Sequence, residues 1–97
     1  MRFEWDETKN LQNIGKHGIS FETAALVFDD PHALSDQDRE IGGEERWQTI
    51  GSAGALIVLV AHLWWDDEDG EDTIRIISAR KASSAEKKSY EAQKKSG

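Results

Sequence analysis

Apolar residues in the first part of the chain recur at the spacing of helices. A short strand at residues 2–5 is followed by a helix that Asp6 caps and that runs to about Lys16. Leu11 and Ile14 give this helix a thin apolar stripe, which is the face expected to pack against the rest of the domain.

A second predicted helix begins after Ser20, a residue suited to the N-terminal cap. Its core face consists of four residues at helical spacing, Phe21, Ala24, Ala25 and Phe28. Residues 29–31, Asp-Asp-Pro, stop it.

The second half of the chain is typical of strands joined by tight loops. Residues 32–45 are polar and rich in turn formers, with a short strand near 33–34. The pattern then predicts a strand at 46–50, a hairpin loop at 51–54, a central strand at 56–65, a charged loop at 66–72 and a returning strand at 73–80.

Ser83 and Glu86 form a capping box for a last, lysine-rich helix that carries Tyr90, and the final few residues are predicted to be disordered. The whole chain, residues 1–97, is therefore one α+β two-layer domain. Its predicted sheet is an antiparallel meander of three to four strands, with two N-terminal helices and one C-terminal helix.

Arg75 and Arg80 lie five residues apart in the last predicted strand. Strict alternation places them on opposite faces, unless the strand ends first or a bulge re-aims Arg80. Two guanidinium groups at the rim of a sheet can clamp an anion, although two solvated arginines on an edge strand are the simpler interpretation.

Charge is distributed unevenly along the chain, whose net charge is −7. The part before residue 73 is strongly acidic, with six acids in the segment Asp66–Asp72 alone, and the part after it is basic. The chain has no cysteine, which excludes disulfides and thiolate zinc sites and fits a reducing compartment. Its longest apolar run, Ala55–Ala61, is too short to cross a bilayer, and no segment resembles a signal peptide, so a cytoplasmic location is expected.

Metal chemistry has little support in the sequence. The three histidines, at positions 17, 32 and 62, fall in different predicted elements, and segment 66–72 lacks the spacing of an EF-hand loop. A metal-dependent hydrolase is the weakest of the functional hypotheses, and no cofactor is expected.

Several basic and proton-transferring residues are predicted near the ends of elements: Lys16, His17, Glu45, Arg46, Arg75, Arg80 and Tyr90. RNA can be cleaved by its own 2′-hydroxyl if a base, cations for the phosphate and an acid are supplied. His17 or Glu45 could be the base, with the arginines as cations. Each residue also has a structural alternative: His17 could finish a helix, Glu45 could pair with a lysine, and Tyr90 could cover the sheet.

Five blocks of the sequence resemble the BrnT toxin family, in the family's order: Trp5-Asp6-x-x-Lys9, Asn13-x-x-Lys16-His17-Gly18-Ile19-x-Phe21, Phe28-x-Asp30-Pro31, Glu45-Arg46 followed by Ile50-Gly51, and Arg75-Ile76-Ile77-Ser78-Ala79-Arg80-x-Ala82 with Glu86 and Tyr90. The resemblance implies a RelE-like fold and a ribonuclease toxin of a bacterial type II toxin-antitoxin system that arrests translation. It also implies a BrnA-type ribbon-helix-helix antitoxin, through which alone the toxin would contact operator DNA.

The resemblance further implies site residues. The expected catalytic residues are His17, Glu45, Arg46 and Arg80, and the expected RNA-binding residues are Lys16, Arg75, Lys81 and Tyr90. The acidic segment Asp66–Asp72 departs from this picture: it could point away from RNA, dock a basic antitoxin segment or mark weakened activity. The alternative function is therefore a catalytically weak binding module that acts through the antitoxin.

Overall fold

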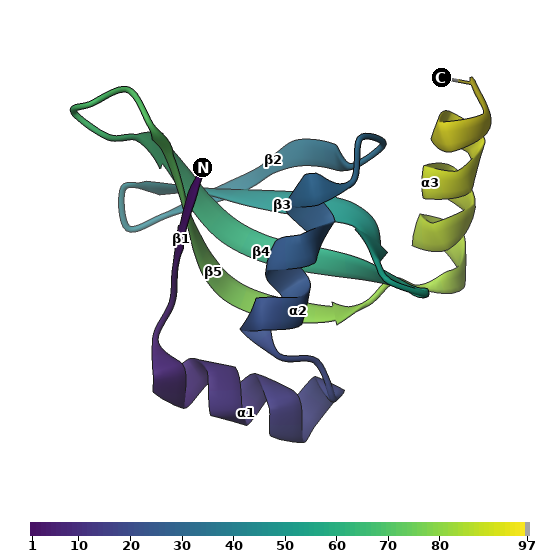
Figure 1. The fold of residues 1–97 in the computed structure, drawn as a ribbon, viewed down its shortest axis with the longest axis horizontal. Helices are drawn as coiled ribbons and strands as arrows, with labels where there is room; N and C mark the ends of the chain where they lie inside the picture. The colour runs from purple at the N-terminus through teal and green to yellow at the C-terminus, as the bar shows by residue number, and fades with distance from the viewer. Residues whose placement is uncertain (97) are drawn as a thin grey trace.

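Five strands form one mixed sheet in the computed structural model, which describes residues 1–96 (Figure 1). In chain order the elements are β1 (Arg2–Glu4), α1 (Glu7–His17), α2 (Phe21–Ala25), the 3₁₀ helix η1 (Leu26–Asp29), β2 (Leu34–Ile41), β3 (Glu44–Ala53), β4 (Leu56–Asp66), β5 (Asp72–Lys81) and α3 (Ser84–Ser96). The strand order is β1-β5-β4-β3-β2. The prediction of an α+β fold with three helical regions is confirmed.

The sheet differs from the predicted antiparallel meander of three to four strands. β1 pairs with β5 in parallel, and the other neighbours are antiparallel. β2 is a full edge strand where only a short one was expected, and seven of its eight residues are exposed. An edge strand that buries few residues has no alternation of apolar and polar positions, so the sequence pattern did not reveal the full length of β2.

The predicted hairpin loop at residues 51–54 is also wrong, because β3 continues to Ala53 and only Gly54 and Ala55 form the turn. Gly51 is inside the strand, where Val27 and Asp30 pack against it. A Cβ atom at position 51 would lie 2.9 Å from Cγ1 of Val27. This glycine therefore permits close packing of η1 on the sheet rather than a turn.

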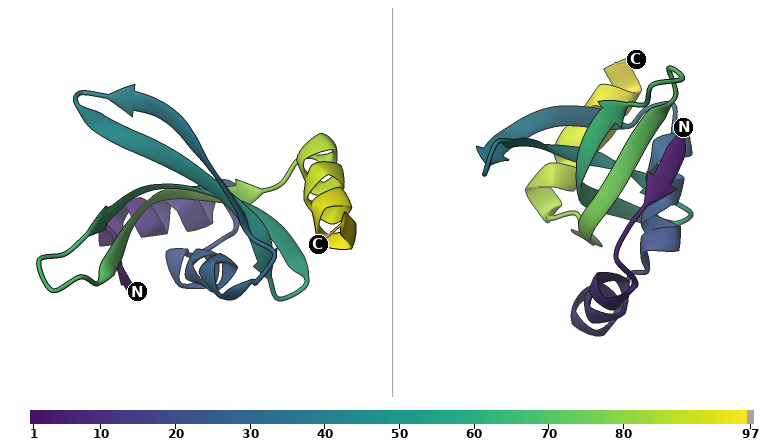
Figure 2. Two further views of the ribbon diagram at one scale, coloured as in Figure 1. Left: turned by 90° about the horizontal axis from the view of Figure 1, so that it is seen from above. Right: turned by 90° about the vertical axis from the view of Figure 1, so that its left-hand side faces the viewer.

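The hydrophobic core lies between the sheet and the segment that contains α2 and η1 (Figures 1 and 2). Its buried residues are Ile19, Phe21, Ala24 and Val27 from the helical segment, and Ala53, Val58, Val60, Ile74, Ile76 and Ala79 from the sheet. Figure 2 shows α3 away from α1 and α2, at the opposite end of the sheet from the β4–β5 loop. No helix among residues 1–96 is long and apolar enough to span a membrane.

Helix α1 does not bury its apolar stripe. Leu11 is 62% exposed and Ile14 42%, whereas Asn10 and Asn13 are buried. The Asn13 amide donates to the carbonyls of Ile19 (2.9 Å) and Ala79 (2.8 Å) and accepts from the Ala79 N–H. Since β1 pairs only with residues 73–75, the edge of β5 beyond it is free, and Asn13 takes the place of a neighbouring strand there.

The predicted ends of α1 and the predicted start of α3 are confirmed, whereas the second predicted helix changes at Leu26 from α2 into the 3₁₀ helix η1. The Asp6 carboxylate accepts from the Lys9 N–H, and Gly18 ends α1 with φ 72°, a left-handed conformation that suits glycine. Ser83 and Glu86 bond reciprocally to each other's backbone N–H. α3 reaches Ser96, and Gly97, part of the predicted disordered tail, lies outside the described residues.

Candidate functional site

A β-bulge at Ile77 places Arg75 and Arg80 on the same face of the sheet. Across the bulge, Ala61 pairs with Ser78 and His62 pairs with Ile76, so Ile77 has no partner in β4. Arg75 then lies opposite Leu63 and Arg80 opposite Leu59. Leu59 and Leu63 are four residues apart in one strand and share a face, so the two arginines do as well.

Arg46 also belongs to this face. It precedes Trp47, whose ring contacts Trp64 on the side of the sheet that the helices cover, so alternation directs Arg46 to the other side. Its Nε is buried and has no hydrogen-bond partner within residues 1–96. Three arginines, Arg46, Arg75 and Arg80, thus share one side of the sheet, which we call the arginine face.

Lys16 and His17 lie together in a basic hollow at the C-terminal end of α1, beside the bulge. The hollow has a volume of about 250 Å³ and is lined by Lys9, Gln12, Asn13, Lys16, His17, Ile77 and Ser78. None of these lining residues is acidic. Lys16 and His17 occupy the last turn of α1, at the negative end of the helix dipole. Ser78, which lies opposite Ala61, connects the hollow to the arginine face.

Sequence reasoning missed Lys9, Asn13 and Ser78 as neighbours of His17. The available signal was the spacing of Lys9, Asn13 and Lys16, since residues three and four apart lie on one side of a helix. Ser78 could not be assigned in this way, because its position depends on the bulge.

Arg80 is held by Glu86 at the start of α3. Its Nη1 and Nη2 donate to the two Glu86 carboxylate oxygens at 2.8 and 3.0 Å. The hydrogen bonds from Arg80 and from the Ser83 backbone lower the pKa of Glu86 to about 2. These two hydrogen bonds fix the orientation of the Arg80 guanidinium. The neighbouring residue, Lys81, is exposed.

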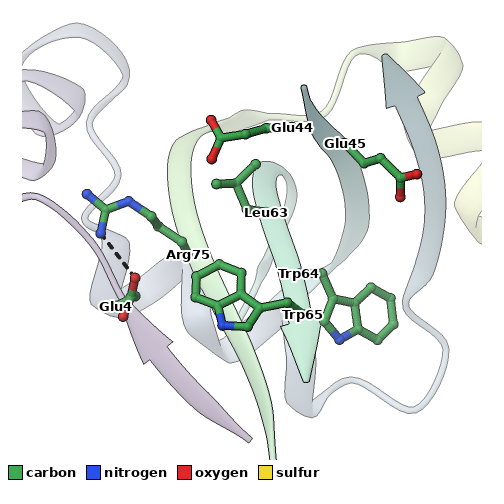
Figure 3. Close-up of a pocket in the computed structure, with 7 residues that line it drawn as sticks. All are labelled: Glu4, Glu44, Glu45, Leu63, Trp64, Trp65 and Arg75. Carbon is green, nitrogen blue, oxygen red and sulfur yellow. Dashed lines mark hydrogen bonds and ion pairs between the residues drawn. The ribbon is translucent and has the colours of Figure 1, made fainter. Parts of the chain in front are cut away.

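Glu45 does not share the hollow that holds His17. It lines a separate hollow of about 570 Å³ between the start of β3 and the end of β4, together with Glu4, Glu44, Leu63, Trp64, Trp65 and Arg75 (Figure 3). Arg75 is paired there with Glu4 at 3.2 Å. The structure therefore separates two residues that were both considered as the base, Glu45 and His17.

Tyr90 is a core residue in this structure, with 1% of its surface exposed. Its hydroxyl donates to the Asp30 carboxylate, which also accepts from the backbone N–H groups of Ser52 and His32. Burial raises the pKa of Asp30, but these hydrogen bonds outweigh it and hold the pKa at about 2. The Tyr90 hydroxyl is thus directed at Asp30 rather than at the surface.

The three histidines are separate in space as well as in sequence. His62 is fully buried, and its Nδ1 donates to the Leu63 carbonyl while Nε2 accepts from the Thr49 hydroxyl at 2.7 Å. Within residues 1–96 no group of three or more histidine, aspartate or glutamate side chains is arranged to hold a metal ion.

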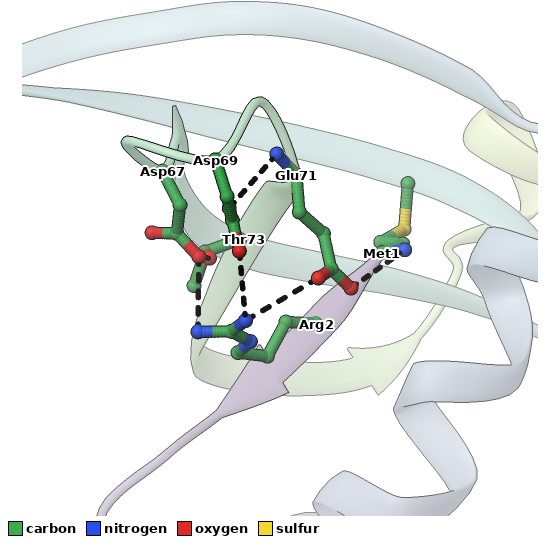
Figure 4. Close-up of polar contacts among 6 residues, drawn as sticks. All are labelled: Met1, Arg2, Asp67, Asp69, Glu71 and Thr73. Atoms are coloured by element: carbon green, nitrogen blue, oxygen red, sulfur yellow. Dashed lines mark hydrogen bonds and ion pairs between the residues drawn. The ribbon is translucent and has the colours of Figure 1, made fainter.

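The acidic β4–β5 loop is compensated within the chain (Figure 4). Arg2 lies 3.1 Å from Asp67, 3.8 Å from Asp69 and 3.3 Å from Glu71. The N-terminal ammonium group of Met1 lies 3.4 Å from Glu71. These ion pairs connect β1 to the loop. The positive charges of Arg2 and of the N-terminus offset much of the negative charge of the loop.

A basic hollow beside a face with three arginines is the chemistry of a protein that binds a polyanion. The comparison with known families defines the class: the model described as "Ribonuclease toxin, BrnT, of type II toxin-antitoxin system" matches residues 5–86. The chain belongs to this family, which confirms the resemblance found in the sequence. No curated protein matches the chain. Membership implies an RNA substrate and an antitoxin partner.

Proposed function

We propose that this protein cleaves RNA through attack of the substrate's own 2′-hydroxyl, with the scissile phosphate in the basic hollow at the end of α1. The observation that supports this most directly is the grouping of Lys9, Lys16 and His17 without a carboxylate among the lining residues. The arginine face continues from Ser78 and offers further cations for the neighbouring phosphates.

In the proposed reaction His17 accepts the proton of the 2′-hydroxyl, and the resulting oxyanion attacks phosphorus. Lys9 and Lys16 offset the charge that develops on the phosphoryl oxygens. The bond to the 5′-oxygen breaks, and that oxygen takes a proton from Lys16 or from water. The products are a 2′,3′-cyclic phosphate and a 5′-hydroxyl end, and no step requires a metal ion.

The biological setting proposed here follows from the family. Cleavage of RNA would inhibit translation in the cytoplasm, and a BrnA-type ribbon-helix-helix antitoxin would neutralise the protein. The net charge of −7 supports contact with operator DNA only through that antitoxin, because an acidic protein gains little from DNA phosphates.

The test compares the purified protein with His17→Ala and Lys16→Ala on a single-stranded RNA, with EDTA and with magnesium. We expect cleavage to fall by about 10²–10⁴-fold in His17→Ala, the usual contribution of a general base. His32→Ala is the matched control, since within residues 1–96 the side chain of His32 makes no hydrogen bond or ion pair and only its backbone N–H donates to Asp30. Equal cleavage by wild type and His17→Ala, or activity abolished by EDTA, would overturn the proposed mechanism.

The second candidate is a binding module with weak catalysis. The observation that favours it is the ion pair of Arg80 with Glu86, in which this guanidinium is already bound to a carboxylate of the same chain. If the wild-type protein binds its antitoxin and leaves RNA intact under both conditions, this second function is supported.

A further inference from the structure

The hollow that contains Glu45 combines exposed indole rings with carboxylates. Trp64 and Trp65 are 38% and 39% exposed. A second hollow of about 320 Å³ adjoins it and shares Glu45, Trp64 and Trp65, with Asp66 and Asp72 on its wall. We call the combined surface the tryptophan groove. Figure 3 shows the two indole rings on opposite sides of β4, Trp65 toward Arg75 and Trp64 toward Glu45, so the groove wraps around the end of this strand.

The groove carries negative charge that the chain does not compensate. Glu4 and Arg75 neutralise each other. The other four carboxylates, at Glu44, Glu45, Asp66 and Asp72, make no ion pair with any residue in the described part of the chain, residues 1–96. Asp66 shares a hydrogen bond with Asp72, and this contact, with the repulsion between the two charges, raises the pKa of Asp66.

The nearby β4–β5 loop is different, although it is equally acidic. Its carboxylates at positions 67, 69 and 71 already face Arg2. Among the carboxylates between positions 67 and 71 only that of Glu68 makes no ion pair within residues 1–96, so most of the negative charge that remains open to a partner in this region is at the groove. An external cation would be attracted to these unpaired carboxylates.

The occupant of such a groove must be positively charged. RNA phosphates would meet four carboxylates, and exposed tryptophans alone do not overcome that repulsion. Guanidinium and ammonium groups suit both parts of the surface, because they bind carboxylates and also lie on the faces of indole rings. Arginine is the better fit, since its planar group stacks and donates at the same time.

We propose that the tryptophan groove binds an arginine- or lysine-bearing segment of the antitoxin. The proposal rests on the proposed function for the identity of the partner, but its chemistry depends only on the groove. The RNA would then lie at the basic hollow and along the arginine face, and the antitoxin segment at the tryptophan groove, with Arg75 at the border of the two because it lines the groove and belongs to the arginine face.

Isothermal titration with octa-arginine tests the groove on the full chain. Trp65→Ala and Glu45→Gln should each weaken binding about tenfold, through lost cation–π and ionic contacts. Glu68→Gln is the matched control, because it removes the same charge from an exposed position outside the groove. The affinity of Glu68→Gln for octa-arginine should differ from that of the wild type by less than about twofold.

Equal losses in Glu45→Gln and Glu68→Gln would mean diffuse attraction and would overturn the proposal. A single-stranded oligouridine that displaces octa-arginine from the wild type but fails to bind Trp65→Ala would overturn it in favour of RNA. The affinities of the toxin variants for a BrnA-type antitoxin should follow the same order as their affinities for octa-arginine. RNA cleavage by the wild type and by Glu45→Gln is measured in parallel. A wild type that binds octa-arginine but cleaves no RNA would contradict the ribonuclease function alone, whereas equal octa-arginine binding by the wild type and Glu45→Gln would contradict the groove alone.

Discussion

Arg75 and Arg80 lie on one face of β5, although they are five positions apart, because Ile77 bulges out of the pairing with β4. Each guanidinium is paired with one glutamate, Arg75 with Glu4 and Arg80 with Glu86. Both pairs are partly exposed, so RNA phosphates can compete for the guanidinium groups at little cost. The bulge thus converts two arginines on opposite faces into one cationic surface.

Arg75→Ala and Arg80→Ala should each weaken binding of a 2′-O-methyl RNA that cannot be cleaved. Each lost phosphate contact should reduce the slope of log Kd against log salt by about 0.7, the value for single strands. Arg39→Ala, an exposed arginine on β2, is the control and should leave the slope unchanged. An unchanged slope in both variants would remove the arginine face from the RNA site.

Tyr90→Phe should destabilise the protein without reducing RNA cleavage. The change removes a hydrogen bond to the charged Asp30, which is worth about 1.5–3 kcal/mol. Urea unfolding measures the loss, and a cleavage assay on the folded variant measures activity. A large fall in cleavage with unchanged stability would instead support the RNA-binding role that the family resemblance implied for Tyr90.

Asn13→Ala should be more damaging than Leu11→Ala, although leucine is the apolar residue. Without the Asn13 amide, the N–H and C=O of Ala79 are left buried and unpaired, at about 1–3 kcal/mol for each group. Leu11 is mostly exposed, so Leu11→Ala should lower the free energy of unfolding by less than about 0.5 kcal/mol. Thermal unfolding of the two variants side by side decides the order.

Stability should fall as the pH drops below about 6.5, because burial lowers the pKa of His62. Below this pH the unfolded chain binds a proton at His62 that the folded chain does not. The free energy of unfolding therefore decreases until the pH reaches the folded pKa of His62, by at most about 1.4 kcal/mol per pH unit. His62→Asn should remove this component from the pH profile of urea unfolding. The same slope in the variant would assign the effect to other groups.

A second loss of stability is expected at lower pH. Glu86 and Asp30 both have folded pKa values of about 2, against ordinary values of 4.5 and 3.8. Their contribution is complete above those ordinary values and disappears as the pH falls toward 2, when the carboxylates become protonated. Glu86→Gln should flatten the profile in this range, and the effect should shrink in high salt because its partner Arg80 is 44% exposed.

The sequence by itself determined the starts of the three helices, the central strand and the family. Asp6, Ser20 and Ser83 cap the helices that follow them, as predicted, because a cap depends on residues three positions apart. The grouping of Lys16 with His17 was also predictable, since they are neighbours at one helix end.

Only the tertiary structure decided which residues face each other across elements. The burial of Asn13 instead of Leu11, the strand conformation of Gly51, the exposed edge strand β2 and the bulge at Ile77 all depend on contacts with distant segments. Periodicity records how one segment is buried on average, whereas a free strand edge or an extra residue in a ladder is a property of two segments together. For this reason the sequence could only propose candidate site residues, and the fold divided them among the basic hollow, the arginine face, the tryptophan groove and the core.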